Sequence, residues 1–92
     1  MSIPPPTASM LLKSLFHYEI QKVEKLEELQ RQLQLCKSLP KTEDPVRDIF
    51  HLKQHTLRKE ILELEVEAIE SNRKETERLY LAAKRREEKT EL

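Results

Sequence analysis

The second half of the chain decides the fold, and from residue 44 to residue 92 it reads DPVRDIFHLKQHTLRKEILELEVEAIESNRKETERLYLAAKRREEKTEL. This stretch has no glycine and no proline after Pro45, so nothing in it stops a helix once one has begun. We therefore predict one long helix over residues 45–92. Its apolar residues form two neighbouring lines, which is typical of a helix that contacts more than one neighbour. The first line contains Phe50, Leu57, Ile61, Leu64 and Ala68, and the second contains Leu62, Val66, Ile69, Thr76, Tyr80 and Ala83.

The composition limits the chain to one small helical unit. Its 92 residues are 37% charged and include no tryptophan, which leaves little bulk for a thick core. The absence of glycine disfavours β-hairpins and phosphate-binding loops, and the richness in Leu, Glu, Lys, Gln and Arg favours helices. The sequence therefore predicts an all-α fold.

Charge and cysteine content indicate the cellular setting. The 17 basic residues balance the 17 acidic ones, so no net field attracts nucleic acid or an anionic membrane. The single cysteine, Cys36, has no partner for an intramolecular disulfide, and no apolar run approaches the roughly eighteen residues that span a bilayer. We expect a soluble intracellular protein, cytoplasmic or nuclear, that does not insert into a membrane.

The first half of the chain predicts an arm, a helix and a short linker. Consecutive prolines make residues 1–8 an extended, disordered arm. A first helix is predicted over residues 9–39, capped by Thr7 or Ser9, and Pro40 ends it. Residues 40–44 form the linker.

Asp44 and Pro45 predict where the second helix begins. Aspartate is a favoured N-cap residue, and proline is favoured at the first helical position. A connection this short between two helices favours an antiparallel hairpin.

The two helices can be fitted together by placing Ser38 opposite Pro45. The apolar line of the first helix has the spacing of a coiled coil, and this register pairs it with the first line of the second helix. The charges agree with this register. Glu24, Glu27 and Glu28 then lie near Arg58 and Lys59, and the acidic run from Glu60 to Glu70 lies along the half of the first helix that contains Lys13, His17 and Lys22. We therefore predict an antiparallel helical hairpin or coiled coil, completed by oligomerisation. The predicted hairpin core is Leu12, Phe16, Ile20, Val23, Leu26, Leu29, Leu33, Phe50, Leu57, Ile61, Leu64 and Ala68.

The same register leaves apolar residues for a partner. The second apolar line stays uncovered, and the apolar residues 79–83 project beyond the start of helix one. A partner helix, a second copy of the chain or an earlier start of helix one would cover them. The predicted partner-binding residues are Leu62, Val66, Ile69, Leu79, Tyr80 and Ala83.

Two histidines and the cysteine raise the question of chemistry. His51 and His55 are one helical turn apart, a spacing found in metal sites, and Cys36 is a possible third ligand across the hairpin. The glutamate of a zinc protease is missing between them, and a slender hairpin has no pocket for a base and an oxyanion site around a nucleophilic cysteine. We therefore expect no metal, no cofactor, no small-molecule substrate and no enzymatic activity.

The pattern favours a coiled-coil protein–protein interaction module, acting as an adaptor or as a structural subunit of a larger helical assembly. Its partners are itself, other helical proteins, or both. The alternative is a nucleic-acid-associated factor that uses the basic run Lys84, Arg85 and Arg86. That run is followed directly by Glu87 and Glu88, and cations near a helix C-terminus are favoured by the helix dipole alone. An enzyme accessory protein or a metal protein is the third class.

Overall fold

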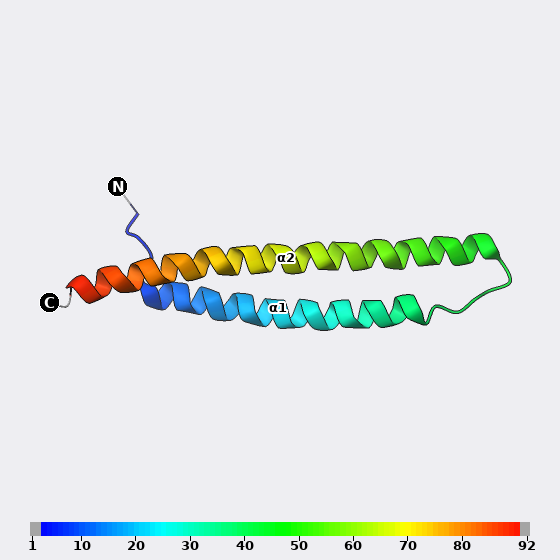
Figure 1. The fold of residues 1–92 in the computed structure, drawn as a ribbon, viewed down its shortest axis with the longest axis horizontal. Helices are drawn as coiled ribbons and strands as arrows, with labels where there is room; N and C mark the ends of the chain where they lie inside the picture. Colours follow the sequence, from blue (N-terminus) through cyan, green and yellow to red (C-terminus); the bar gives the residue numbers. More distant parts are fainter. Residues whose placement is uncertain (1–2, 91–92) are drawn as a thin grey trace.

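The chain is all-helical, and its two helices pack against each other along a rod (Figure 1). These features come from a computed structural model that describes residues 3–90, with no strand in that range. Helix α1 spans Ala8–Lys37 and helix α2 spans Pro45–Thr90, and the start of α1 lies at the same end of the rod as the end of α2. The rod measures 74 × 25 × 15 Å, and its radius of gyration of 20.7 Å far exceeds the ~12 Å of a compact domain of this length.

Helix α1 begins and ends at local signals. Thr7 has an extended backbone, and its side-chain oxygen accepts a hydrogen bond of 3.2 Å from the N–H of Met10. This N-cap is one of the two expected, and it starts the helix at Ala8. At the other end, the N–H of Ser38 bonds to the carbonyls of Gln34 and Leu35. Residues 3–7 and 38–44 have no regular secondary structure, and the expectations for residues 1, 2, 91 and 92 lie outside the described residues.

Helix α2 begins at the predicted Asp44 cap. The Oδ1 atom of Asp44 accepts hydrogen bonds from the N–H groups of Val46 at 3.0 Å and Arg47 at 3.4 Å. The carboxylate of Asp48 then accepts bonds from the hydroxyl and the N–H of Thr42, at 2.7 and 3.0 Å. These bonds to Thr42 lower the pKa of Asp48, and they tie the connection to the first turn of α2.

We expect the Asp44→Ala variant to lose about 1 kcal/mol of unfolding free energy, because two N–H groups at the start of α2 would lose their acceptor. Urea unfolding followed by circular dichroism at one fixed protein concentration measures the loss. The neighbouring Glu43→Ala variant is the control and should change the free energy by less than about 0.5 kcal/mol. Equal values for the two variants would contradict the capping role.

The contact between the helices runs along one series of residues on each helix, here called the seam. Its members recur at steps of three and four residues, as the layers of a coiled coil do, and all are buried or partly buried. Leu62 is 0% exposed and Ala83 is 1% exposed. On α1 the seam consists of Ala8, Leu11, Leu15, Tyr18, Lys22, Lys25, Leu29, Gln32 and Cys36, and on α2 of His55, Lys59, Leu62, Val66, Ile69, Arg73, Thr76, Tyr80 and Ala83.

The predicted core is therefore wrong. Of its members only Leu29 belongs to the seam, and residues such as Phe16 and Leu64 are 62% and 64% exposed. The reason is that the seam contains long charged and polar side chains, whose aliphatic stems cover the contact while their charged ends pair across it. The exposed members are Leu12, Phe16, Ile20, Val23, Leu26, Leu33, Phe50, Leu57, Ile61, Leu64 and Ala68.

The predicted register is wrong as well. Gln32 contacts His55 and Lys25 contacts Glu65, so each α1 residue meets α2 one helical turn or more beyond the predicted position. The connection over residues 38–44 is extended enough to let the start of α2 pass the end of α1 (Figure 1). As a result Ala83 packs with Ala8 and Leu11, and Tyr80 packs against this cluster. The C-terminal apolar segment is thus largely covered by the first turns of α1.

Candidate protein-interaction surface

A network of charges joins the two helices around Arg73. Its guanidinium lies 2.7 Å from Glu70 and 3.0 Å from Glu77 on α2, and 3.5 Å from Glu19 on α1. Nζ of Lys22 on α1 lies 2.9 Å from Oε2 of Glu70, the oxygen that also accepts a hydrogen bond from Nε of Arg73. The hydrogen bonds from Arg73, and then those from Lys22, lower the pKa of Glu70 to about 2.

We expect acid to weaken the contact at Glu70. Its pKa is lower in the folded chain, about 2, than the ordinary value of 4.5, so its stabilising effect is complete above pH 4.5 and is lost as the pH falls towards 2. The Glu70→Gln variant should therefore lose less stability than the parent between these two pH values. Thermal unfolding across that range measures the difference. Glu63→Gln removes one surface charge on the same helix and is the control; an identical pH profile for Glu70→Gln and the parent would contradict the assignment.

Further along the rod, polar contacts again hold the helices together. Lys25 lies 2.7 Å from Glu65, which raises the pKa of Lys25, and Arg58 lies 2.6 Å from Glu28, which lowers the pKa of Glu28. The sequence pattern placed a group of three glutamates, Glu28 among them, near Arg58, and the pair of Glu28 and Arg58 lies within that group. These ion pairs are still partly open to solvent and contribute little stability each, and they fix the orientation of the helices more than their affinity.

The buried side-chain amide of Gln32 lies in the seam, near the end of the rod where residues 38–44 connect the two helices. Its Nε2 atom lies 2.8 Å from Nδ1 of His55 and donates a bond of 3.1 Å to the carbonyl of His55. Gln32 is buried, so its amide needs these partners. A buried polar residue at a seam position is a known means of fixing register in helical pairs.

Helix α2 presents an exposed apolar stripe on its outer face, here called the outer stripe. It consists of Phe50, Gln54, Leu57, Ile61, Leu64 and Ala68, spaced by steps of four and three residues. Leu64 follows the buried Leu62 by two residues, which is about 200° around the helix, so it points away from α1. All six residues are exposed, and only Gln54 is polar.

Helix α1 carries a second exposed stripe, here called the α1 stripe, on another side of the rod. Glu19 occupies one position of the α1 stripe and contacts Arg73. Ala68 of the outer stripe instead lines a surface hollow with Gln21 and Glu24 of α1, and Gln21 lies about 200° around α1 from Glu19. The two stripes of one chain therefore do not cover each other. The apolar members of the α1 stripe are Leu12, Phe16, Val23, Leu26 and Leu33.

The total surface is large for a chain of this mass. The chain exposes 7787 Å², whereas a compact monomer of 11.0 kDa exposes about 5,600 Å². The excess of about 2,000 Å² is similar to the area that a standard protein–protein interface buries. The surface is therefore that of a chain with room for one or more partners.

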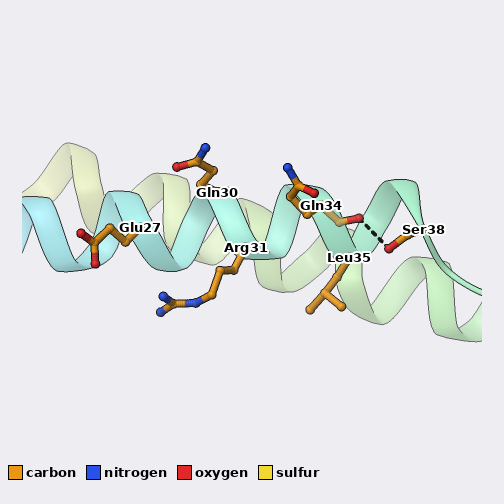
Figure 2. A pocket seen from close by; sticks show the side chains of 6 residues that line it. All are labelled: Glu27, Gln30, Arg31, Gln34, Leu35 and Ser38. Carbon is orange, nitrogen blue, oxygen red and sulfur yellow. Dashed lines mark hydrogen bonds between the residues drawn. The ribbon is translucent and has the colours of Figure 1, made fainter.

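Several hollows lie on the surface of the described part of the chain. Figure 2 shows the side chains that line one of them, and all come from the outer side of α1 and its end. Gln30 and Gln34 point one way while Glu27, Arg31 and Leu35 point the other, so they do not converge on a common point. A ligand site needs convergent polar groups in an enclosed cavity.

The histidines and the cysteine occupy different surroundings. His55 is in the seam against Gln32, while His51 and Cys36 line a small hollow beside the connection, together with Asp48. Among residues 3–90, no three histidine, cysteine, aspartate or glutamate side chains are grouped as a metal would require. Within that same range, neither helix is long and apolar enough to cross a membrane.

The predicted partner-binding residues mostly form the seam. Leu62 and Ala83 are buried there, and Val66, Ile69 and Tyr80 are partly buried, while Leu79 is exposed. The outer stripe, assigned from the sequence to the core, is instead the free surface. The charges that pair across the helices, such as Lys25 with Glu65, were the signal that could have revealed the seam.

Comparisons with protein-family models, with curated proteins and with solved structures gave no match to this chain.

Proposed function

We propose that this protein is a non-enzymatic helical-hairpin module that acts as an adaptor or structural subunit of a larger helical assembly. One observation carries the proposal: both helices expose apolar stripes at coiled-coil spacing, while the contact between them contains several charged residues. A chain that works alone gains most by the opposite arrangement, with apolar side chains inside and charged ones outside.

The shape and spacing support helical partners. Stripes with steps of three and four residues fit the face of another helix, whose side chains interdigitate with them. A rod 74 Å long offers this surface along an extended contact. Covering the stripes would complete an assembly of four or more helices.

Replacing apolar residues of the stripes with glutamate tests the proposal. We expect Phe16→Glu/Leu26→Glu, Leu57→Glu/Leu64→Glu, or both double variants to reduce the size of the assembly, because each buries charge in a helix contact. Light scattering after size-exclusion chromatography measures the purified chain, and the same chromatography of native cell extract measures complexes with other proteins. The control is Leu35→Glu/Leu81→Glu, which changes two half-exposed leucines outside both stripes.

Two results together would overturn the proposed function: the purified chain is a cooperatively folded monomer, and neither stripe variant changes the size of the native complex. An equal effect of the control would show a general loss of solubility or folding instead of a specific surface. Circular dichroism of each variant separates these outcomes, because the exposed substitutions should leave the helix content unchanged.

A further inference from the structure

We propose that the outer stripe of α2 is a self-complementary interface, through which two copies of this chain pack α2 against α2, antiparallel, about a two-fold axis between Leu57 and Ile61. The inference rests on the proposed function and names the partner of one stripe. It places α2 helices at the centre of a four-helix arrangement and α1 helices on the outside. Two-fold dimers of this kind are the commonest assemblies of identical chains.

In this register the apolar residues of the outer stripe lie opposite complementary residues of the same stripe in the second copy. When Leu57 lies opposite Ile61 of a second copy, Phe50 lies opposite Ala68 and Gln54 lies opposite Leu64, and the two-fold axis repeats each layer. The largest side chain of the stripe thus meets the smallest, which keeps the volume of the layers even. The stripe runs from residue 50 to residue 68, about 27 Å of helix at 1.5 Å per residue.

The charges beside the outer stripe favour the antiparallel orientation. Lys53 and Arg58 lie along its first half, and Glu60, Glu65 and Glu67 lie along its second half. Antiparallel packing brings Lys53 beside Glu60 of the second copy and Arg58 beside Glu65, whereas parallel packing would place like charges together.

The charges are also available for this contact. Lys53 and Glu60 are exposed, and neither takes part in an ion pair within residues 3–90. Arg58 and Glu65 already pair with Glu28 and Lys25 of their own chain, so the second copy would extend those pairs into a network across the dimer.

Nothing in the described part of the chain covers the outer stripe. The arm before α1 lies at the opposite end of the rod, where Pro5 and Pro6 line a hollow with Ala83. The α1 stripe is a poorer match for itself, because Glu19 and Gln30 interrupt its spacing. The excess surface of about 2,000 Å² per chain is enough for a dimer of standard size, which buries about 800 Å² on each side.

A charge exchange across the axis tests the proposal in the full chain. Lys53→Glu and Glu60→Lys each place like charges together at two symmetric points, and we expect each to raise the dimer dissociation constant about tenfold or more at low salt. The double variant Lys53→Glu/Glu60→Lys restores unlike pairs and should return the constant to within about threefold of the parent. Sedimentation equilibrium over a range of concentrations measures these constants.

A substitution in the stripe gives a larger effect. Leu57→Glu/Leu64→Glu should raise the dissociation constant about a hundredfold or more, because it places charges in the dimer contact. The matched control is Leu26→Glu/Leu33→Glu in the α1 stripe, which should change it by less than about threefold.

The outcomes separate this inference from the proposed function. Three results would overturn the α2 interface. The parent chain could be monomeric, the dimer could be lost only in the α1 control variant, or the double exchange variant could dimerise no more tightly than the single variants. In each of those cases the proposed function would stand if a stripe variant still changed the size of the native complex. If no stripe variant changed the purified or the native assembly, both would fall.

Discussion

The Leu62→Ala variant should lose about 2 to 5 kcal/mol of unfolding free energy, the largest loss that we expect from a single substitution in this chain. Leu62 is 0% exposed and is the one large side chain fully buried within residues 3–90. Removing its isobutyl group takes away its transfer free energy and leaves a cavity between the helices. Against a total stability of roughly 5 to 15 kcal/mol for a small domain, such a loss is enough to unfold part of the population.

Urea unfolding at one fixed concentration measures this effect, because the stability of an associating chain depends on concentration. The control is Leu81→Ala on the same helix, where the side chain is half exposed; we expect a change below about 0.5 kcal/mol. Equal losses for Leu62→Ala and Leu81→Ala would mean that the seam does not run through Leu62. That result would return α1 to the face that the sequence pattern favoured.

The second large effect is expected at Ala83. This residue is 1% exposed and packs with Ala8 and Leu11, so two small side chains let the start of α1 approach the last turns of α2. The Ala83→Leu variant adds three carbon atoms beside Ala8 and Leu11, which already contact Ala83, and it should cost about 1 to 3 kcal/mol. Amide hydrogen exchange in the first turn of α1 should also become faster, because that turn would be pushed away from α2.

The neighbouring Ala82 supplies a close control. Ala82 is exposed, and Ala82→Leu makes the same chemical change on the outer side of the helix. We expect it to leave both the stability and the exchange of the first α1 turn unchanged to within about 0.5 kcal/mol. If Ala82→Leu were the more damaging variant, the segment from Leu79 to Ala83 would face a partner through its other side, as the sequence pattern had suggested.

A dimer through the outer stripe would leave a further surface for other proteins. The α1 stripe lies on another side of each rod, so α2 packing against α2 does not cover it. Its members, such as Phe16 and Leu26, remain exposed in that arrangement. An adaptor requires two such surfaces, here one stripe for self-association and one for another helical protein.

Local signals in the sequence were enough to predict the helices and the break between them. Thr7 and Asp44 cap the two helices because each offers a side-chain oxygen to N–H groups that have no partner in the first turn. Pro40 excludes a helix through the connection. The sequence also placed a group of glutamates near Arg58, and Glu28 of that group pairs with it, since charge complementarity acts over several residues and tolerates an error of one turn.

The sequence by itself determined an all-helical chain of two helices, because caps, prolines and helix propensity act over a few neighbouring residues. It did not determine which of two heptad-spaced faces on each helix turns inward. Ranking faces by apolar content selected Phe16 and Leu64, whereas the tertiary structure turns Lys25, Arg73 and their partners towards the other helix. The physical reason is that a long charged side chain can cover a helix contact with its methylene groups and still reach an opposite charge, and this depends on what lies across the contact.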